Sequence, residues 1–336
     1  MSILDHVPAG FTPRPVQVKA LLEVEAAWAT HDVIVIPAPV AAGKSLIGVT
    51  IAKWQESYGF GCGILTPQIV LQNQYAATHP YIPLLKGRAR YDCHGYPASS
   101  CEITHREEKK YCAECPYLKA RDKAVKAKVG IFNFHSYMFN RAYKETLFID
   151  EAHNLMGMIA EFYTLRIWRH KTWYPQMNNK EEVALFLEGE IVRQKAEIKR
   201  NTAWMPKKKQ LAHNTLEKFR KVHEAVDSNP ADFFVNQRMS LYRGKQQPML
   251  EILPLNIKKV RHGLWPRTKV KKIILSSATL KAIDVEELGL GDRNILFLDC
   301  KSPIDAEQRP FVFEPVANMS FKYQEKNAPK MADYIN

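Results

Sequence analysis

A short tripeptide, Gly43-Lys44-Ser45, has the residue types and surroundings of a phosphate-binding loop. The β-branched run at 33–36 predicts a buried strand before it, and apolar residues at helical spacing over 46–54 predict a helix after it. In this context backbone N–H groups and the helix N-terminus bind phosphates, Lys44 reaches the terminal phosphates, and the Ser45 hydroxyl completes a Mg²⁺ shell. The sequence therefore predicts a nucleotide site.

A second set of chemical groups, Asp150 and Glu151, follows the apolar run at 147–149. A parallel strand there delivers both carboxylates to the C-terminal edge of the sheet, where open α/β sheets place their ligands. One carboxylate can hold the metal through water while its neighbour acts as general base for the attacking water. Two adjacent acids standing alone would more often form a solvated turn. The phosphate loop upstream favours a catalytic set, in which we include Lys44 and His153.

Ser277 and Thr279 follow a third predicted strand, at 273–275. Small hydroxyl residues in such a place are, by themselves, more often helix or turn caps than functional groups. Their position after the two preceding motifs is what favours a functional role.

Four of the six cysteines cluster within residues 93–115, between the phosphate loop and the acidic pair: Cys93, Cys101, Cys112 and Cys115. In a chain of 336 residues this clustering is unlike a secreted disulfide framework, and it favours metal binding in a reducing compartment. Four thiolates suit either an iron–sulfur cluster or a tetrahedral Zn²⁺, and spacing alone does not separate them. His94 and His105 are alternative zinc ligands. A cage that only holds an insertion together also fits.

Composition limits the class of protein. With 46% hydrophobic residues the chain can bury a sizeable core. Its net charge of +13 favours a polyanionic partner, although membrane and ribosome proteins share this feature. The sequence shows no signal-peptide pattern and no run of about 18 apolar residues that could span a bilayer. We therefore expect a soluble, intracellular protein without a membrane partner.

In chain order, GKS, DEAH and SAT each follow a β-branched strand, and together they resemble the motor lobe of superfamily 2 helicases. The chain closely resembles the XPD/DinG family of iron–sulfur DNA helicases. This resemblance implies an α/β fold, namely a RecA-like P-loop lobe with a parallel sheet, a small cysteine-rich iron–sulfur insertion and a helical arch insertion. It also implies ATP-dependent 5′ to 3′ unwinding of single-stranded or forked DNA, with ATP, Mg²⁺ and a 4Fe–4S cluster as cofactors.

Further segments extend the resemblance at the nucleotide site. The stretch FTPRPVQVKAL resembles the adenine-recognition segment, which implies that Gln17 contacts the base with help from Arg14. The loop APVAAGKS shares Pro39 with the pattern PSGTGKT, but alanines replace its Gly and Thr, and a Cβ at Ala41 crowds a backbone that must approach the phosphates. The predicted nucleotide-binding residues are Gln17, Ala38, Ala41, Ala42, Gly43, Lys44 and Ser45.

Other segments resemble parts of the family that contact DNA. The stretch GILTPQIVLQNQY implies that Thr66, Pro67 and Gln68 lie near the single strand. The run from Cys115 to Phe139 implies that three residues lie near the DNA path or the nucleotide: Asn133, His135 and Tyr137. Simple packing at a strand end is the alternative for these three. Ser277 and Thr279 would couple the nucleotide to DNA.

The four cysteines occupy the place where this family carries its 4Fe–4S cluster, so the resemblance implies that cluster, with Zn²⁺ as the alternative occupant. Between residues 86 and 128 eleven lysines and arginines outnumber six acids, and Tyr91, Tyr96 and Tyr111 are interleaved with them. Basic groups bind phosphates and aromatic rings stack on unpaired bases, so this insertion can act as a wedge at a duplex junction. A merely solvated basic face is the alternative.

The resemblance also predicts domain boundaries: lobe 1 at 1–85, 129–155 and 246–300, the iron–sulfur insertion at 86–128, the helical arch at 156–245, and the start of a truncated second lobe at 301–336. Apolar stripes at 187–198 and 211–226 predict the helical pair of the arch. Only 57 residues follow Thr279, which is too few for a second RecA-like lobe. We expect that lobe to come from missing sequence or from another chain.

Three functions remain open at this point. The first is an ATP-dependent DNA helicase of XPD/DinG type, active in DNA repair and located in the cytoplasm, at the nucleoid or in an infected host. The second is a nucleic-acid-binding P-loop module without independent turnover, because hydrolysis in such motors needs charge stabilisation across an interlobe cleft. The third is a DEAH-type RNA helicase, against which the cysteine cage argues.

Overall fold

The chain divides into two compact units in the computed structural model, Met1–Lys301 and Ser302–Asn336. The described residues are 1–39, 42–93, 96–100, 114–169, 174, 180–200, 206–228, 230–242, 244–260, 264–300 and 323–335. In the second unit they form one helix, α13 (Gln324–Ile335). The predicted start of a second motor lobe at 301–336 stays a prediction.

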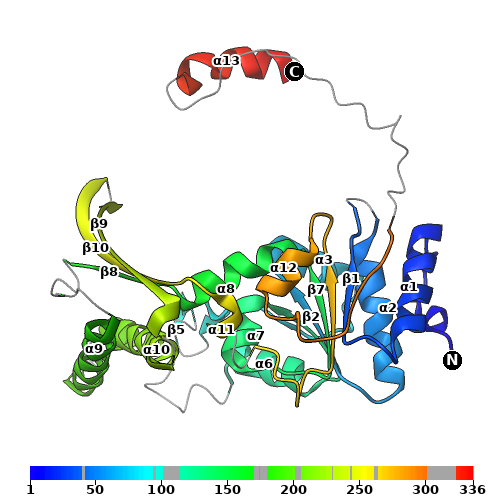
Figure 1. Ribbon diagram of the computed structural model, residues 1–336, viewed down its shortest axis with the longest axis horizontal. Helices are drawn as coiled ribbons and strands as arrows, with labels where there is room; N and C mark the ends of the chain where they lie inside the picture. The colour runs from blue at the N-terminus through cyan, green and yellow to red at the C-terminus, as the bar shows by residue number, and fades with distance from the viewer. Residues whose placement is uncertain are drawn as a thin grey trace. The chain divides into compact units, whose positions relative to one another are not determined.

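A seven-stranded parallel sheet forms the centre of the first unit (Figure 1), in the order β12-β1-β11-β7-β2-β6-β3. Its strands are β1 (Val33–Ile36), β2 (Cys62–Thr66), β3 (Leu84–Leu85), β6 (Val129–Asn133), β7 (Thr146–Asp150), β11 (Lys272–Ser276) and β12 (Ile295–Phe297). Every residue of β1, β2 and β7 is buried. Continuous apolar strands are expected where helices cover both faces of a parallel sheet. The predicted α/β class is therefore confirmed.

Helices pack on both faces of this sheet: α1 (Pro15–Ala27), α2 (Lys44–Ser57), α3 (Ile69–Thr78), α6 (Pro116–Lys126), α7 (Phe134–Asn140), α8 (Leu155–Tyr163), α11 (Ile257–Val260) and α12 (Ala282–Glu287). Single 3-10 turns occur at Ile3–His6, Arg88–Arg90, Ala152–Asn154 and Pro230–Asp232. Alternate strand residues face opposite sides. Ile34 and Phe148 join one core with α1, α2 and α3, whereas Val35 and Leu147 join a second core with α6, α7 and α8.

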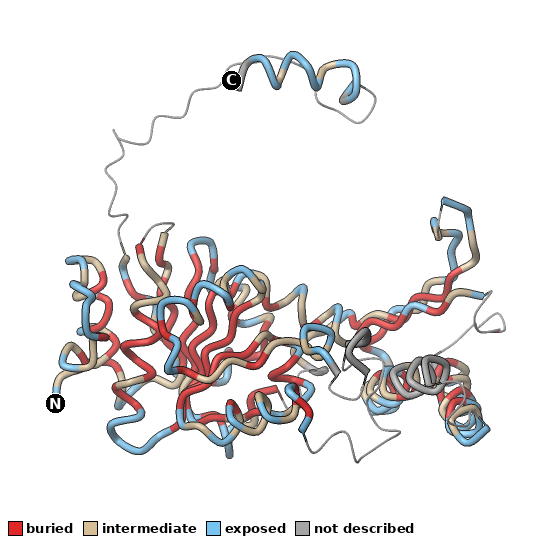
Figure 2. Tube along the Cα trace, turned by 180° about the vertical axis from the view of Figure 1, so that it is seen from behind, coloured by how far each residue is buried: buried red, intermediate tan, exposed pale blue. Residues whose placement is uncertain are grey.

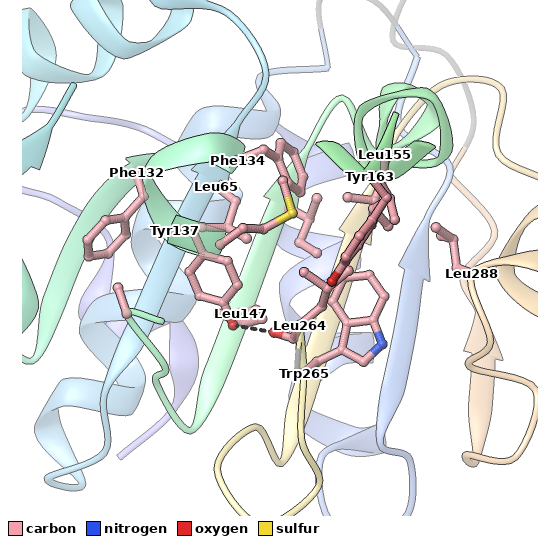
Figure 3. Packing of buried hydrophobic residues seen from close by; sticks show 14 of the residues in the cluster. Leu65, Phe132, Phe134, Tyr137, Leu147, Leu155, Tyr163, Leu264, Trp265 and Leu288 are labelled. Atoms are coloured by element: carbon pink, nitrogen blue, oxygen red, sulfur yellow. Dashed lines mark hydrogen bonds between the residues drawn. The ribbon is translucent and has the colours of Figure 1, made fainter. Parts of the chain in front are cut away.

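The first core lies inside the layered part of the molecule, where buried segments follow the strands (Figure 2). The second core also includes buried residues from the region between β7 and β11, such as Leu187, Phe219 and Leu250. Figure 3 shows the second core, in which the Tyr137 hydroxyl donates to the Leu264 carbonyl oxygen at 2.9 Å. Across the described ranges no helix combines the length and the apolar character needed to cross a bilayer.

The region between β7 and β11 combines a helical pair with a second sheet. Helices α9 (Lys180–Arg200) and α10 (Pro206–Ser228) pack against each other. Three antiparallel strands, in the order β8-β10-β9, accompany them: β8 (Leu165–Trp168), β9 (Phe233–Tyr242) and β10 (Lys245–Pro254). The predicted insertion at 156–245 is therefore not helical alone, and this part of the expectation is corrected.

The sequence concealed this sheet for two reasons. Strand β10 contains Pro248, a residue that argues against a strand in local sequence patterns, and β9 lies at a sheet edge with mostly half-exposed residues. Residues 233–242 pair with 245–254 along their whole length, so the hairpin crosses the predicted boundary at 245. Pairing with a distant partner, β8, completed a sheet that local periodicity did not reveal.

The predicted cysteine-rich insertion is described only in part. Within 86–128 the structure describes a short hairpin, β4 (Asp92–Cys93) with β5 (Tyr96–Ser100), and the helix α6. Residues 101–113 lie outside the described residues, as do His94 and the side chain of Cys93.

Candidate nucleotide-binding site

Three neighbouring strands end at the same level and bring the three motifs together. In the sheet register, Ser276 of β11 stands beside Ile36 of β1 on one side and Asp150 of β7 on the other. The phosphate loop follows Ile36, DEAH begins at Asp150, and SAT follows Ser276. Parallel strands in register deliver their C-terminal residues to one edge, where ligands of such sheets bind.

The backbone of the loop before α2 has a shape that would let a ligand approach it closely. Gly43 caps α2 in the left-handed conformation, with φ of 76°, which a glycine adopts without cost. Ala38 and Ala42 are both buried, and the Ala42 N–H donates to the Pro39 carbonyl oxygen at 3.2 Å. Ala41 lies outside the described residues, so the predicted crowding by its Cβ stays a prediction.

Gln17 ties the N-terminal segment to this loop. Its Nε2 donates to the Gly43 carbonyl oxygen at 3.1 Å, and its Oε1 accepts the Arg14 backbone N–H at 2.7 Å. A Cβ added to Gly43 would lie 2.1 Å from Gln17 Nε2, which leaves no room for a side chain there. Gln17 thus holds the loop in the structure. Its predicted contact with a base stays a prediction.

The lysine of the loop is paired with an acid of the DEAH segment. Lys44 Nζ lies 2.5 Å from Glu151 Oε1, and both side chains are partly buried. Glu151 itself has φ of 50° and ψ of 47°, an uncommon conformation for a residue other than glycine. Such backbone geometry clusters at functional sites.

Asp150 is almost fully buried at the end of β7, and both of its carboxylate oxygens are bonded. Oδ2 accepts the Tyr75 O–H at 3.1 Å, and Oδ1 accepts the Glu151 N–H at 3.0 Å. Burial raises the pKa of Asp150, while the nearby Lys44 charge lowers it. The pKa of Tyr75 is raised well above its usual value, mainly by burial, so its hydroxyl stays protonated and donates.

His153 connects DEAH to SAT. Its Nδ1 lies 3.0 Å from Ser277 Oγ and 3.4 Å from Glu151 Oε2, and its Nε2 lies 3.0 Å from Asn154 Nδ2. Ser277 is fully buried, and its Oγ also accepts the Thr279 N–H at 3.3 Å. A displacement of His153 would therefore change its contacts with both Glu151 of DEAH and Ser277 of SAT.

An open cleft adjoins this site. Its lining residues are Pro67, Gln68, His135, Asn154, Gly157, Met158 and Glu161. It brings together Gln68 and His135, which the sequence predicted from separate segments, and Asn154 shares it with the His153 contact. Thr66 lies elsewhere, fully buried at the end of β2, with no hydrogen-bond partner for its hydroxyl among the described groups.

Two lysines of α10 lie near this cleft and were not predicted. Lys221 Nζ stands 3.4 Å from the centre of the Phe162 ring, and that ring also contacts His135. Burial, and then the nearby Lys218, lower the pKa of Lys221 to about 8. Partial burial, followed by the Lys221 charge, lowers the pKa of His135.

Two residues predicted near the DNA path have structural roles in the described chain. The Asn133 side chain caps α7 by accepting the Ser136 N–H at 2.6 Å. Tyr137 belongs to the second core. Both match the alternative of packing at a strand end.

The described residues at the start of the cysteine-rich insertion, 86–91, pack against residues of α6 and α7. The Tyr91 ring meets the Tyr117 ring edge-on at 5.6 Å, and its hydroxyl accepts the Lys86 N–H at 3.0 Å. The Arg88 guanidinium lies over the rings of Tyr117 and Phe139. Tyr91 is thus engaged within the protein, and its stacking on a base stays a prediction.

The predicted metal ligands fall mainly outside the described residues. Cys115 is described: it is buried and precedes α6 as its N-cap. Cys101, Cys112 and the side chain of Cys93 lie outside the described set. Among the side chains that are described, no group of three potential metal ligands occurs.

Comparison with known proteins places the fold. No family model matches the chain, and no curated protein matches it. A solved structure titled XPD helicase is similar, with a TM-score of 0.52 and 12% sequence identity. The match covers 86% of this chain and 62% of that one, so the chain spans less than two thirds of the length of this structural neighbour. The seven-stranded unit is therefore an α/β lobe of RecA-like type with an XPD-like fold.

Proposed function

We propose that this chain is the first motor lobe of an ATP-dependent DNA helicase of XPD/DinG type. One observation carries the proposal: Lys44, the first residue of α2, lies 2.5 Å from Glu151, beside the buried Asp150, at the C-terminal edge of a parallel sheet. A cation for phosphates and a pair of carboxylates in this arrangement suit nucleotide hydrolysis. Fold likeness alone would not carry an activity.

At the nucleotide, N–H groups at the start of α2 and Lys44 bind the phosphates. An arriving phosphate competes with Glu151 for Lys44, which frees the carboxylate to accept a proton from the attacking water. Ser45 and Asp150 are the residues that would hold Mg²⁺, and a buried carboxylate beside a hydroxyl fits such a site. When bound, Mg²⁺ supplies charge that neutralises the phosphates. Gln17, in this proposal, also contacts the adenine.

In this proposal, Ser277 and Thr279 of the SAT segment couple nucleotide binding to nucleic-acid binding. His153 contacts both Glu151 and Ser277, so a movement of Glu151 on nucleotide binding changes the contacts of Ser277 and Thr279. Because β11 lies between β1 and β7, the segment after it is in reach of both catalytic segments.

The cleft beside the site supports single-stranded or forked DNA as the partner. Gln68 and His135 offer hydrogen bonds, and Lys218 and Lys221 supply positive charge close by. Phosphates bind such cations, and the net charge of +13 favours a polyanion. The 5′ to 3′ polarity and a role in DNA repair rest on the family resemblance alone.

We include a 4Fe–4S cluster in the proposal, held by Cys93, Cys101, Cys112 and Cys115. The donor set of four thiolates suits it, and the one described ligand, Cys115, is buried directly before Pro116 at the start of α6. Such a cluster would hold the insertion together as a wedge at the duplex junction. Zn²⁺ is the alternative occupant of the same thiolates.

The remaining parts of the proposal concern a second motor lobe and the cellular location. A second motor lobe, from further sequence or from another chain, would complete the interlobe site and allow unwinding. A cytoplasmic, nucleoid-associated location follows from a DNA substrate, and an infected host cell takes its place for a viral protein.

The first test is ATP hydrolysis by the full chain, with and without single-stranded DNA. We expect stimulation by DNA that Lys44→Ala abolishes. Lys19→Ala is a matched control, because Lys19 is exposed on α1, where it pairs with the surface acids Glu23 and Asp299 and donates to the Asp299 carbonyl oxygen. Binding of nucleotide and DNA without turnover would identify a binding module instead. Stimulation by RNA but not by DNA would identify an RNA helicase.

The metal is tested separately, by purifying the chain without oxygen and measuring iron, sulfide and zinc. About four irons and four sulfides, with broad absorbance near 400 nm that Cys112→Ser removes, are expected. One zinc in a colourless protein would replace the cluster by a zinc cage.

A further inference from the structure

Tyr75 is a buried tyrosine that contacts both residues assigned above to the cation. It lies on α3, is 1% exposed, and donates its hydroxyl hydrogen to Asp150 Oδ2 at 3.1 Å. The Ser45 side chain lies close enough to the same hydroxyl to lower its pKa. Tyr75 therefore lies between the start of α2 and the end of β7, to which its hydrogen bond is made.

This contact leaves the Asp150 carboxylate a single orientation. Its other oxygen, Oδ1, already accepts the Glu151 N–H at 3.0 Å. Without the tyrosine hydroxyl, Oδ2 would lose its one described hydrogen-bond donor in a site that is 2% exposed. A buried carboxylate oxygen that loses its donor seeks another partner, and the side chain turns accordingly.

We propose that Tyr75 is a positioning residue for the divalent cation of the nucleotide site, which it serves by orienting the Asp150 carboxylate and the Ser45 hydroxyl. The inference rests on the proposed function. Partners that hydrogen-bond metal ligands orient them, and removing such a partner typically costs about 10–100-fold in metal affinity. Tyr75 itself touches neither the nucleotide nor the reacting atoms, so it acts through its two neighbours.

The alternative is a core tyrosine whose hydroxyl is merely satisfied, and the chain offers a matched example. Tyr137 is also 1% exposed, and it donates to a backbone carbonyl oxygen, that of Leu264, at 2.9 Å (Figure 3). Its hydrogen bond is as buried as that of Tyr75 but reaches no carboxylate. Loss of either hydroxyl has a similar structural cost, whereas only Tyr75 should affect the cation.

The experiment compares the wild-type chain with Tyr75→Phe and Tyr137→Phe. Mn²⁺ replaces Mg²⁺ as the probe, and its binding to the chain with ADP is followed by electron paramagnetic resonance. Binding of a fluorescent ADP analogue in EDTA is measured in parallel. We expect Tyr75→Phe to weaken Mn²⁺ binding by about tenfold or more with little change in ADP binding in EDTA, and Tyr137→Phe to leave both unchanged.

Each outcome decides the matter. Unchanged Mn²⁺ affinity in Tyr75→Phe, or equal weakening in both variants, overturns the role of Tyr75 while nucleotide binding by the wild-type chain still stands. A wild-type chain that binds neither ADP nor Mn²⁺ overturns the proposed function and this inference with it. ADP binding in EDTA and urea denaturation show whether Tyr75→Phe is folded, and a variant that does not fold while Tyr137→Phe does would overturn a role confined to positioning.

Discussion

The nucleotide site and the cleft beside it meet at Asn154 but are built in contrasting ways. Groups at the nucleotide site come from buried strand ends in register and lie within hydrogen-bonding distance of one another. The cleft is open and lined by residues of the loop before α3, of α7, of the 3-10 turn at Ala152–Asn154 and of α8, and two lysines of α10 lie near it. Strand register positions the first site, whereas the packing of an insertion shapes the second.

Because the two regions are built separately, we predict that a substitution at the sheet edge abolishes ATP hydrolysis without lowering the affinity for DNA. In Glu151→Gln the side chain keeps its size but can no longer accept a proton from water. We expect ATP hydrolysis to fall by about 10²–10⁴-fold. Steady-state rates and fluorescence anisotropy with labelled single-stranded DNA measure the two properties. Equal loss of both would show that the two regions form one functional unit.

A smaller effect, on nucleotide affinity, is expected from a substitution in the phosphate loop. Gly43→Ala places a Cβ 2.1 Å from Gln17 Nε2 and forces a left-handed alanine, so Gln17 must leave its place and nucleotide affinity falls by about tenfold or more. Gly59→Ala is the matched control, since Gly59 has φ of 81° with open space around its Cβ.

Both alanine variants should lose about 1–2 kcal/mol of stability through their left-handed backbone. Calorimetric titration with ADP and chemical denaturation separate the two effects. Normal ADP binding by Gly43→Ala would contradict the tight fit between the loop and Gln17.

In the region between β7 and β11, the expected effect of a substitution is a lower free energy of unfolding. Glu251 of β10 is buried and pairs with Arg166 at 2.7 Å and with Arg238 at 3.2 Å. Because both arginines are about half exposed, Glu251→Gln should lower the free energy of unfolding by about 1–3 kcal/mol. Urea denaturation measures this loss.

Glu286→Gln, which removes an exposed partner of Lys258, serves as the surface control and should change stability by less than about 0.5 kcal/mol. ATP hydrolysis should survive both substitutions. A loss of hydrolysis in Glu251→Gln would mean that the antiparallel sheet supports the nucleotide site.

The smallest effect concerns the cleft. Lys221 has a pKa of about 8, so it is charged below that pH and loses its charge as the pH rises through it. At pH 7, Lys221→Met should therefore reduce the slope of log affinity against log salt for DNA by about 1. Near pH 9 the variant and the wild type should converge.

The exposed Lys195 of α9 provides the control substitution, Lys195→Met, which should leave the salt slope unchanged at both pH values. Salt titrations at the two pH values test the pair. Identical slopes for Lys221→Met and the wild type at pH 7 would remove Lys221 from the DNA path.

Sequence reasoning placed the candidate residues best where their segments follow a strand end. Lys44, Asp150 and Ser277 were predicted at one edge of the sheet because their segments follow predicted strands, and parallel strands in register share that edge. Their roles stay predictions. Tyr75 was missed, since a tyrosine within a helical stretch has no local sign of the carboxylate it meets across the fold. Lys221 was missed for a related reason, because its partner Phe162 lies on another helix.

The amino-acid sequence by itself determined the α/β class, the parallel strands and the order of the motifs, because hydrophobic periodicity and turn residues are local properties. Tertiary structure alone decided that Gln17 holds the loop, that Tyr75 binds Asp150, and that three strands near 165, 240 and 250 form one sheet. These contacts join residues far apart in the chain. Their partners are selected by packing, which no single segment encodes.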